Sequence, residues 1–324
     1  MFKLITTLFC ILCLISTALA DDKNQPAKIE FGMFVTNIHD VNFSDSEYQV
    51  EFWSWFLTDD ISYKPSERTE ITNAKKFSIR NVDVRQITGR FLHSQVFMGT
   101  IKQYWDVSKY PFDTQKLTIS LEDTLDSSGE LIYLIDETSS IANNIIPEGW
   151  SLESFEVLPT ITSYPTTFGD PRRAADTDYK FSQAKAVITL RRNGLRVFIT
   201  SFLGLFVATF LIIIVFTINT SAKYLAIIPL QPRITLCVGS LFAAVGTIYG
   251  LDAKIPYTTS FTLSDSLQMT TFAGIVLAII SSVASDILIK AGKVMMQINL
   301  MMAIWSLFLV LHIGFNAYLI LTSI

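Results

Sequence analysis

The chain has 324 residues, 50% of them hydrophobic, and a formal net charge of −4 from 25 basic and 29 acidic side chains. This mildly acidic balance, without a basic patch, does not favour a nucleic-acid partner. The sequence contains no Ser-His-Asp set, no His-Glu-x-x-His motif and no glycine-rich phosphate loop, and only three histidines. We therefore expect neither an enzyme nor a bound cofactor, and no metal site stands out.

The first 20 residues have the pattern of a secretory signal peptide. Lys3 precedes an apolar run at 4–15, and small residues at 18–20 complete a cleavage pattern. A membrane anchor is the alternative interpretation, but the apolar run is too short to cross a bilayer. We assign residues 1–20 as a signal peptide and expect the mature chain to begin outside the cytoplasm.

Cysteine content limits how the exported part of the chain can be stabilised. Cys10 and Cys13 leave with the signal peptide, and only Cys237 remains in the mature chain. No intrachain disulfide can then form, so we expect the exported domain to depend on its core and on subunit contacts.

Residues 21–195 are predicted to form an exported domain rich in β-strands. Runs with period-two alternation and many β-branched or aromatic residues occur at 28–37, 48–57, 116–121 and 185–190. Turn-forming residues cluster at 42–46, 126–129 and 164–178. Many short strands without an amphipathic helix between them favour an antiparallel β-sandwich.

Residues 196–324 are predicted to form a transmembrane domain of four helices. The apolar stretches are 197–218, 234–251, 266–285 and 298–322, and roughly 20 apolar residues suffice to cross a bilayer. With the N-terminus outside, four crossings place the C-terminus outside as well. The inner connections then carry Lys223, Arg233, Lys290 and Lys293, and the outer loop carries Asp252, Lys254 and Asp265. Positive charge thus lies mainly inside, as membrane insertion favours.

The inner side of this domain has two further features. The connection 219–233 contains an apolar patch and two prolines, so it is either a short helical turn or a segment on the membrane surface. Asp286 and Lys290 are spaced for an ion pair one helical turn apart.

The second apolar stretch, 234–251, is more polar than its neighbours. On a helix its residues Thr235, Gly239, Phe242, Gly246 and Tyr249 share one face, which is small and polar apart from two aromatic rings. One interpretation is a tight seam between helices, since small residues let transmembrane helices approach closely. The other is a pore lining, which requires several copies around a symmetry axis. This helix alone leaves the two interpretations evenly matched.

A proline-containing segment at 110–115, Tyr-Pro-Phe-Asp-Thr-Gln, precedes the predicted strand at 116–121. Further motifs follow a fixed order along the chain: Phe52-Trp-Ser-Trp55, Glu148-Gly-Trp150 with Ser154-Phe155, Arg191-Arg192, and Lys254-Ile-Pro-Tyr257. Together these motifs resemble the pentameric ligand-gated ion channels, the superfamily of the nicotinic and GABA receptors. The resemblance covers the chain from about residue 28 to its end.

The bacterial branch of this superfamily is the more similar one. Animal members carry two cysteines around the proline motif, where this chain has Gln103 and Leu117, and the inner loop 290–296 is only a few residues long. The resemblance implies an α+β multidomain membrane protein, with an immunoglobulin-like antiparallel β-sandwich followed by a four-helix transmembrane bundle. It also implies a homopentamer among membrane lipids in the inner membrane, with the N-terminal domain and the C-terminus in the periplasm.

The resemblance implies a pore lined by the second transmembrane helix, with Phe242 and Tyr249 as the constriction. Cation-conducting members usually have a carboxylate at the inner end of this helix, and 230–233 (Leu-Gln-Pro-Arg) has none. The proline before Arg233 is similar to the anion-conducting branch. Asp252 would form an acidic ring at the outer mouth and concentrate cations there, so we expect cation selectivity.

In the family, the ligand lies between neighbouring sandwiches under a capping hairpin, which here is 164–181. Aromatic wall residues would be Tyr164, Phe168 and Tyr179, able to hold an ammonium by cation–π attraction, whereas Phe181 is expected in the core. The acidic residues Glu122, Asp123 and Asp126 offer a site for an amine or for calcium. The alternative is an ordinary solvated acidic loop. The agonist itself, a small molecule or an ion, is not identified by the sequence.

Coupling between the two domains is also implied by the resemblance. The predicted coupling residues are Pro111, Phe112, Asp113, Arg192, Lys254, Pro256 and Tyr257. Asp113 and Arg192 are expected to face each other near the bilayer surface, where breaking one side of the pair would be costly. The alternative function is a non-conducting membrane receptor or assembly protein on the same fold.

Overall fold

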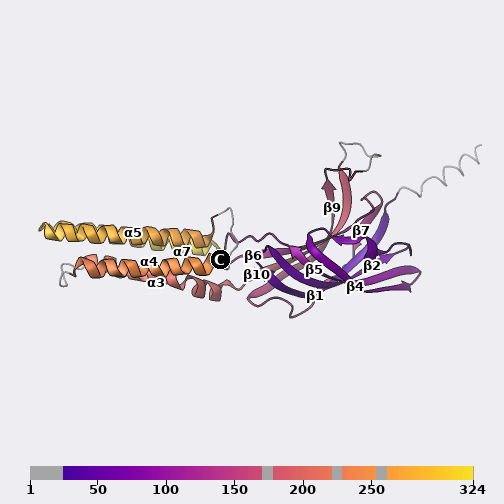
Figure 1. Cartoon of the computed structure of the whole chain (residues 1–324), viewed down its shortest axis with the longest axis horizontal. Coiled ribbons are helices and arrows are strands. Elements are labelled where there is room, and N and C mark those ends of the chain that lie inside the picture. Colours follow the sequence, from indigo (N-terminus) through magenta and orange to yellow (C-terminus); the bar gives the residue numbers. More distant parts are fainter. Residues whose placement is uncertain (1–24, 170–177, 221–227, 253–260, 324) are drawn as a thin grey trace, which may run out of the picture.

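The structure is a computed structural model that describes residues 25–169, 178–220, 228–252 and 261–323. Strands occupy one half of an elongated molecule and helices the other (Figure 1). The predicted signal peptide and the predicted coupling residues Lys254, Pro256 and Tyr257 lie outside the described residues.

The first sheet has six strands in the order β4-β5-β2-β1-β7, with β8 also paired to β1. Its strands are β1 (Ala27–Asn42), β2 (Glu47–Thr58), β4 (Ala74–Ile87), β5 (Arg90–Lys102), β7 (Leu131–Ile135) and β8 (Ser140–Ile141). The predicted purely antiparallel pairing is wrong here, because β7 and β8 run parallel to β1. The chain reaches β7 from the other sheet, so no hairpin forces it to run against β1.

The second sheet is wholly antiparallel, in the order β3-β6-β10-β9. Its strands are β3 (Thr69–Ile71), which follows the short helix α2 (Pro65–Arg68), β6 (Thr114–Asp123), β9 (Trp150–Tyr164) and β10 (Tyr179–Arg192). The four predicted strand runs lie in β1, β2, β6 and β10. Buried side chains of both sheets, such as Phe31, Leu117 and Ile188, belong to one hydrophobic cluster. This confirms a β-rich N-terminal domain.

Within the described residues, four helical spans are long and apolar enough to cross a membrane. They are α3 (Gly194–Thr220), α4 (Leu230–Asp252), α5 (Leu263–Lys290) and a last span made of α6 (Val294–Phe308), η2 (Leu309–Ile313) and α7 (Gly314–Ser323). Each contains one predicted apolar stretch, which confirms a multi-pass membrane protein. Between 22% and 33% of the most apolar window in each span is buried within the chain. Lipid or further protein must therefore cover most of the helical surface.

Candidate ion pathway, domain junction and ligand cavity

One face of α4 packs within the chain. Its buried residues are Arg233, Cys237, Ser240, Ala244, Thr247 and Leu251. The crossing with α3 is close, because a Cβ at Gly204 would lie 2.2 Å from Thr247 Oγ1 and 2.6 Å from the Ala243 carbonyl oxygen. The small-residue seam between helices therefore exists, on a different face from the one predicted to line a pore.

The predicted pore-lining residues Thr235, Gly239, Phe242, Gly246 and Tyr249 are all exposed. Phe242 is 73% exposed and Tyr249 is 75% exposed. Arg233 carries the only charge between residues 231 and 251 and is buried on the opposite face, so this face is uncharged. Asp252, the predicted outer-mouth residue, ends α4, and its side chain is outside the described part. The exposed face is thus available to water or to another copy of the chain.

The structure brings Asp113 and Arg192 together as expected. Arg192 Nε donates to Asp113 Oδ1 at 2.6 Å, and Nη2 donates to Oδ2 at 3.1 Å. The Asp113 side chain is 1% exposed and the Arg192 side chain is 12% exposed. Gln115 Nε2 also donates to Asp113 Oδ2 at 2.6 Å. Bidentate, charge-assisted hydrogen bonds of this kind hold two segments in a fixed geometry.

Aromatic rings from three segments surround the Arg192 guanidinium. Its Cζ lies 4.1 Å from the ring centroid of Trp150, 4.9 Å from that of Phe43 and 5.0 Å from that of Tyr110. Phe43 also stacks on Trp105 at 4.5 Å. Each cation–π contact adds roughly 0.5–2 kcal/mol to holding the charge. The sequence prediction missed Phe43, which is embedded in a polar turn and carries no local signal of this role.

The proline segment contacts the helical domain directly. A Cβ at Gly194 would lie 2.2 Å from the Pro111 carbonyl oxygen, and the rings of Phe112 and Phe198 are 5.4 Å apart. The backbone N–H of Leu263, which begins α5, donates to the Ser108 carbonyl at 3.1 Å. The predicted residues Pro111 and Phe112 therefore meet the start of α3, and the same loop meets the start of α5.

A cavity of about 820 Å³ opens beside the β9–β10 hairpin. Its walls include the predicted aromatic residues Tyr164, Phe168 and Tyr179. The rings of Tyr164 and Phe168 are 5.7 Å apart, and those of Phe168 and Tyr179 are 6.0 Å apart. Phe181, expected in the core, is 5% exposed and also lines the cavity. The sequence thus located this aromatic wall.

Two carboxylates line the same cavity, Glu70 from β3 and Glu122 from β6. They are directly opposite each other in the strand register, an arrangement that costs free energy when both are charged. Gln183 Nε2 and the Tyr164 hydroxyl donate to Glu122 Oε2 at 2.6 and 3.1 Å. Burial, and then the charges of Glu70 and Asp123, raise the pKa of Glu122. Lys75 and Lys76 of β4 line the cavity as well, so its lining carries charges of both signs.

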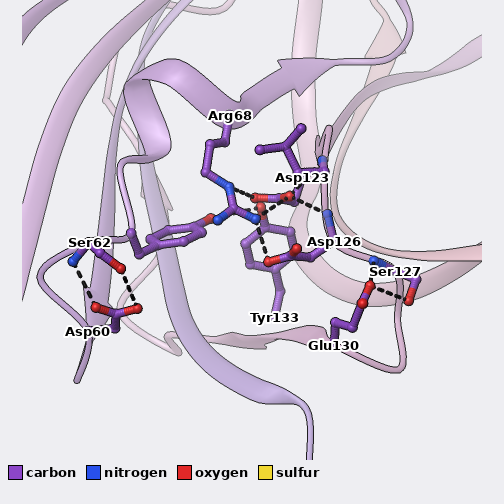
Figure 2. Close-up of polar contacts among 10 residues, drawn as sticks. Asp60, Ser62, Arg68, Asp123, Asp126, Ser127, Glu130 and Tyr133 are labelled. Carbon is purple, nitrogen blue, oxygen red and sulfur yellow. Dashed lines mark hydrogen bonds and ion pairs between the residues drawn. The ribbon is translucent and has the colours of Figure 1, made fainter.

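Asp123 and Asp126 do not line the cavity, because Arg68 binds both of them (Figure 2). Arg68 Nη2 and Nε donate to the two Asp123 oxygens at 2.8 and 3.0 Å, and the guanidinium lies 5.0 Å from the Tyr63 ring centroid. The Asp123 side chain is 1% exposed. Arg68 thus offsets one of the two carboxylate charges and ties the acidic loop to α2, next to the cavity residue Glu70.

Comparison with known proteins does not name a family. No family model and no curated protein matches the chain. Its function must therefore be argued from the site itself.

The three regions lie in series along the molecule. The cavity is in the β-rich half, the Arg192 junction joins that half to α3, and the exposed face of α4 is in the helical half (Figure 1).

Proposed function

We propose that the chain is one subunit of a homopentameric ligand-gated ion channel. The observation that carries this proposal is α4, which packs within the chain by one face and leaves the uncharged face of Thr235, Gly239, Phe242, Gly246 and Tyr249 exposed. Copies of that face around an axis would enclose a path for ions. Phe242 and Tyr249 would form apolar rings that exclude water in the closed state.

The fold and orientation proposed are those of an immunoglobulin-like sandwich in the periplasm above an inner-membrane bundle. Lys290 and Lys293 lie at the turn between α5 and α6, and the start of α5 contacts the β-rich domain. The last span returns toward that domain (Figure 1). Basic residues thus lie at the far end of the bundle, which supports a cytoplasmic location for that end.

The ligand proposed is an organic ammonium compound. Glu70 and Glu122 offer negative charge, and the rings of Tyr164, Phe168 and Tyr179 offer cation–π contacts in the same cavity. Binding would shift a pre-existing equilibrium between closed and open arrangements. With an uncharged lining and Asp252 at the outer end of α4, we propose that cations are conducted.

The test is current through the purified protein in planar bilayers under a salt gradient, with n-butylamine and tetramethylammonium as trial ligands. We expect ligand-evoked current that reverses near the cation equilibrium potential. Reversal near the chloride potential would refute the selectivity. Binding of these compounds without current would favour a non-conducting receptor.

A further inference from the structure

The end of the helical bundle far from the β-rich domain holds a buried polar network. Arg233, in the first turn of α4, is 2% exposed although it begins an apolar helix. We infer that Arg233 is a positioning residue that fixes this end of α4 to the other three spans, with its charge turned away from the ion pathway. This inference rests on the proposed function, because it concerns movement of the proposed pore helix.

Hydrogen bonds from Arg233 reach two neighbouring helices. Its Nη1 donates to Asn219 Oδ1 of α3 at 2.9 Å and to the Ser282 carbonyl of α5 at 3.4 Å. Its Nε donates to the Pro229 carbonyl at 3.3 Å, just before α4 begins. These bonds tie the first turn of α4 to α3 and α5.

Asn219 extends the network to the last span. Its Nδ2 donates to Ser281 Oγ and Ser282 Oγ, each at 3.1 Å. Gln297 Nε2 of α6 donates to the Asn219 carbonyl at 2.6 Å and to Ser285 Oγ at 2.9 Å. All four spans therefore meet at Asn219 and Arg233. Polar side chains buried in membrane helices are costly unless they pair in this way.

The charge of Arg233 faces a carboxylate within the subunit, Asp286, which it shares with Lys290. Arg233 Nη2 lies 3.8 Å from Asp286 Oδ1 and has no hydrogen-bond partner among the described residues. The other carboxylate oxygen, Asp286 Oδ2, pairs with Lys290 Nζ at 2.7 Å. At 3.6 residues per turn, Arg233 and Thr235 point roughly 200° apart around the helix axis. Arg233 therefore does not present its charge on the face of Thr235.

Cys237 provides a reporter that needs no engineered cysteine. It lies one turn after Arg233 on the same face, is 0% exposed, and is the only cysteine of the chain after residue 13. In the assembled mature protein, without residues 1–20, we expect Cys237 to react slowly with a maleimide. We expect the Asn219→Ala and Arg233→Gln variants to react about tenfold faster or more, because a local opening exposes the thiol. Equal labelling rates in protein that remains assembled on size exclusion would overturn the inference, whether or not the protein conducts.

A second arm uses n-butylamine-evoked current. We expect Arg233→Gln and Asn219→Ala each to shift the half-maximal butylamine concentration by about threefold or more, and the double variant to shift it no further than the larger single effect. Arg233→Lys keeps the charge and should shift the half-maximal butylamine concentration less than Arg233→Gln does. Lys290→Gln, at the exposed edge, should shift that concentration less than about twofold. The reversal potential should be unchanged in Arg233→Gln. Additive shifts, or a reversal potential that moves, would overturn the inference, whereas absence of wild-type current would refute only the proposed function.

Discussion

Replacing Asp113 with asparagine tests the junction between the two domains. The substitution keeps the size of the side chain but removes the charge that Arg192 contacts at 2.6 and 3.1 Å. Removing one partner of a buried ion pair costs about 3–5 kcal/mol. We expect a loss near 3 kcal/mol, at the lower end, because the guanidinium keeps its contacts to Trp150 and Phe43 and is 12% exposed. For a domain of this size, that loss lowers the midpoint of thermal unfolding by roughly 6–12 °C.

The assay is thermal unfolding of the full-length protein in detergent, as a double-mutant cycle of Asp113→Asn with Arg192→Met. We expect the double variant to lose less than the sum of the two single variants by about 2 kcal/mol, since no charge is then left unpaired. The matched control is Arg191→Met, because Arg191 is 55% exposed and 4.0 Å from Glu153. It should cost under about 1 kcal/mol. Additive effects, or an Asp113→Asn loss no larger than that of the control, would refute the reasoning.

Three further predictions concern the cavity and the helix crossing. Glu122→Gln should weaken n-butylamine binding about tenfold by calorimetry, the equivalent of 1.4 kcal/mol, and unchanged affinity would exclude Glu122 from the site. Because the pKa of Glu122 is raised, the fold binds its proton more tightly than the unfolded chain does, and this contribution to stability is lost as pH rises through the raised pKa. Wild type should therefore lose thermal stability relative to Glu122→Gln over that rise, while its butylamine affinity increases as the carboxylate ionises. Parallel pH profiles of the two proteins would contradict the assignment. Gly204→Ala should lower the free energy of unfolding by about 1–3 kcal/mol, because its Cβ would meet Thr247 and the Ala243 carbonyl. Gly239→Ala should be tolerated, because its Cβ would lie 3.8 Å from Leu211. Equal losses of stability in thermal unfolding would mean that the crossing of α3 and α4 is not tightly packed.

Local patterns in the sequence were enough to predict the elements that carry the proposal. The period of the apolar residues placed Phe242 and Tyr249 on one face of α4, and that face is the exposed one. The pairing of Asp113 with Arg192, which are 79 residues apart, was instead implied by the family resemblance.

Features that depend on distant partners could not be predicted in the same way. Asp123 looked available for a ligand because its partner, Arg68, lies 55 residues earlier in the sequence. Glu70 was missed because only the pairing of β3 with β6 places it opposite Glu122. The parallel pairing of β7 with β1 follows from a crossover between sheets, which strand patterns along the chain do not encode.

The measurement that tests the central claim most directly is ammonium-evoked current through a Thr235→Cys variant treated with a charged, water-soluble thiol reagent. Thr235 lies on the exposed face of α4, whereas the native Cys237 is 0% exposed on the opposite face. If α4 lines the ion pathway, n-butylamine should evoke current in both proteins. The reagent should then abolish it in the variant and leave wild type unchanged. No evoked current in either protein, or a variant current that survives complete labelling, would contradict the account.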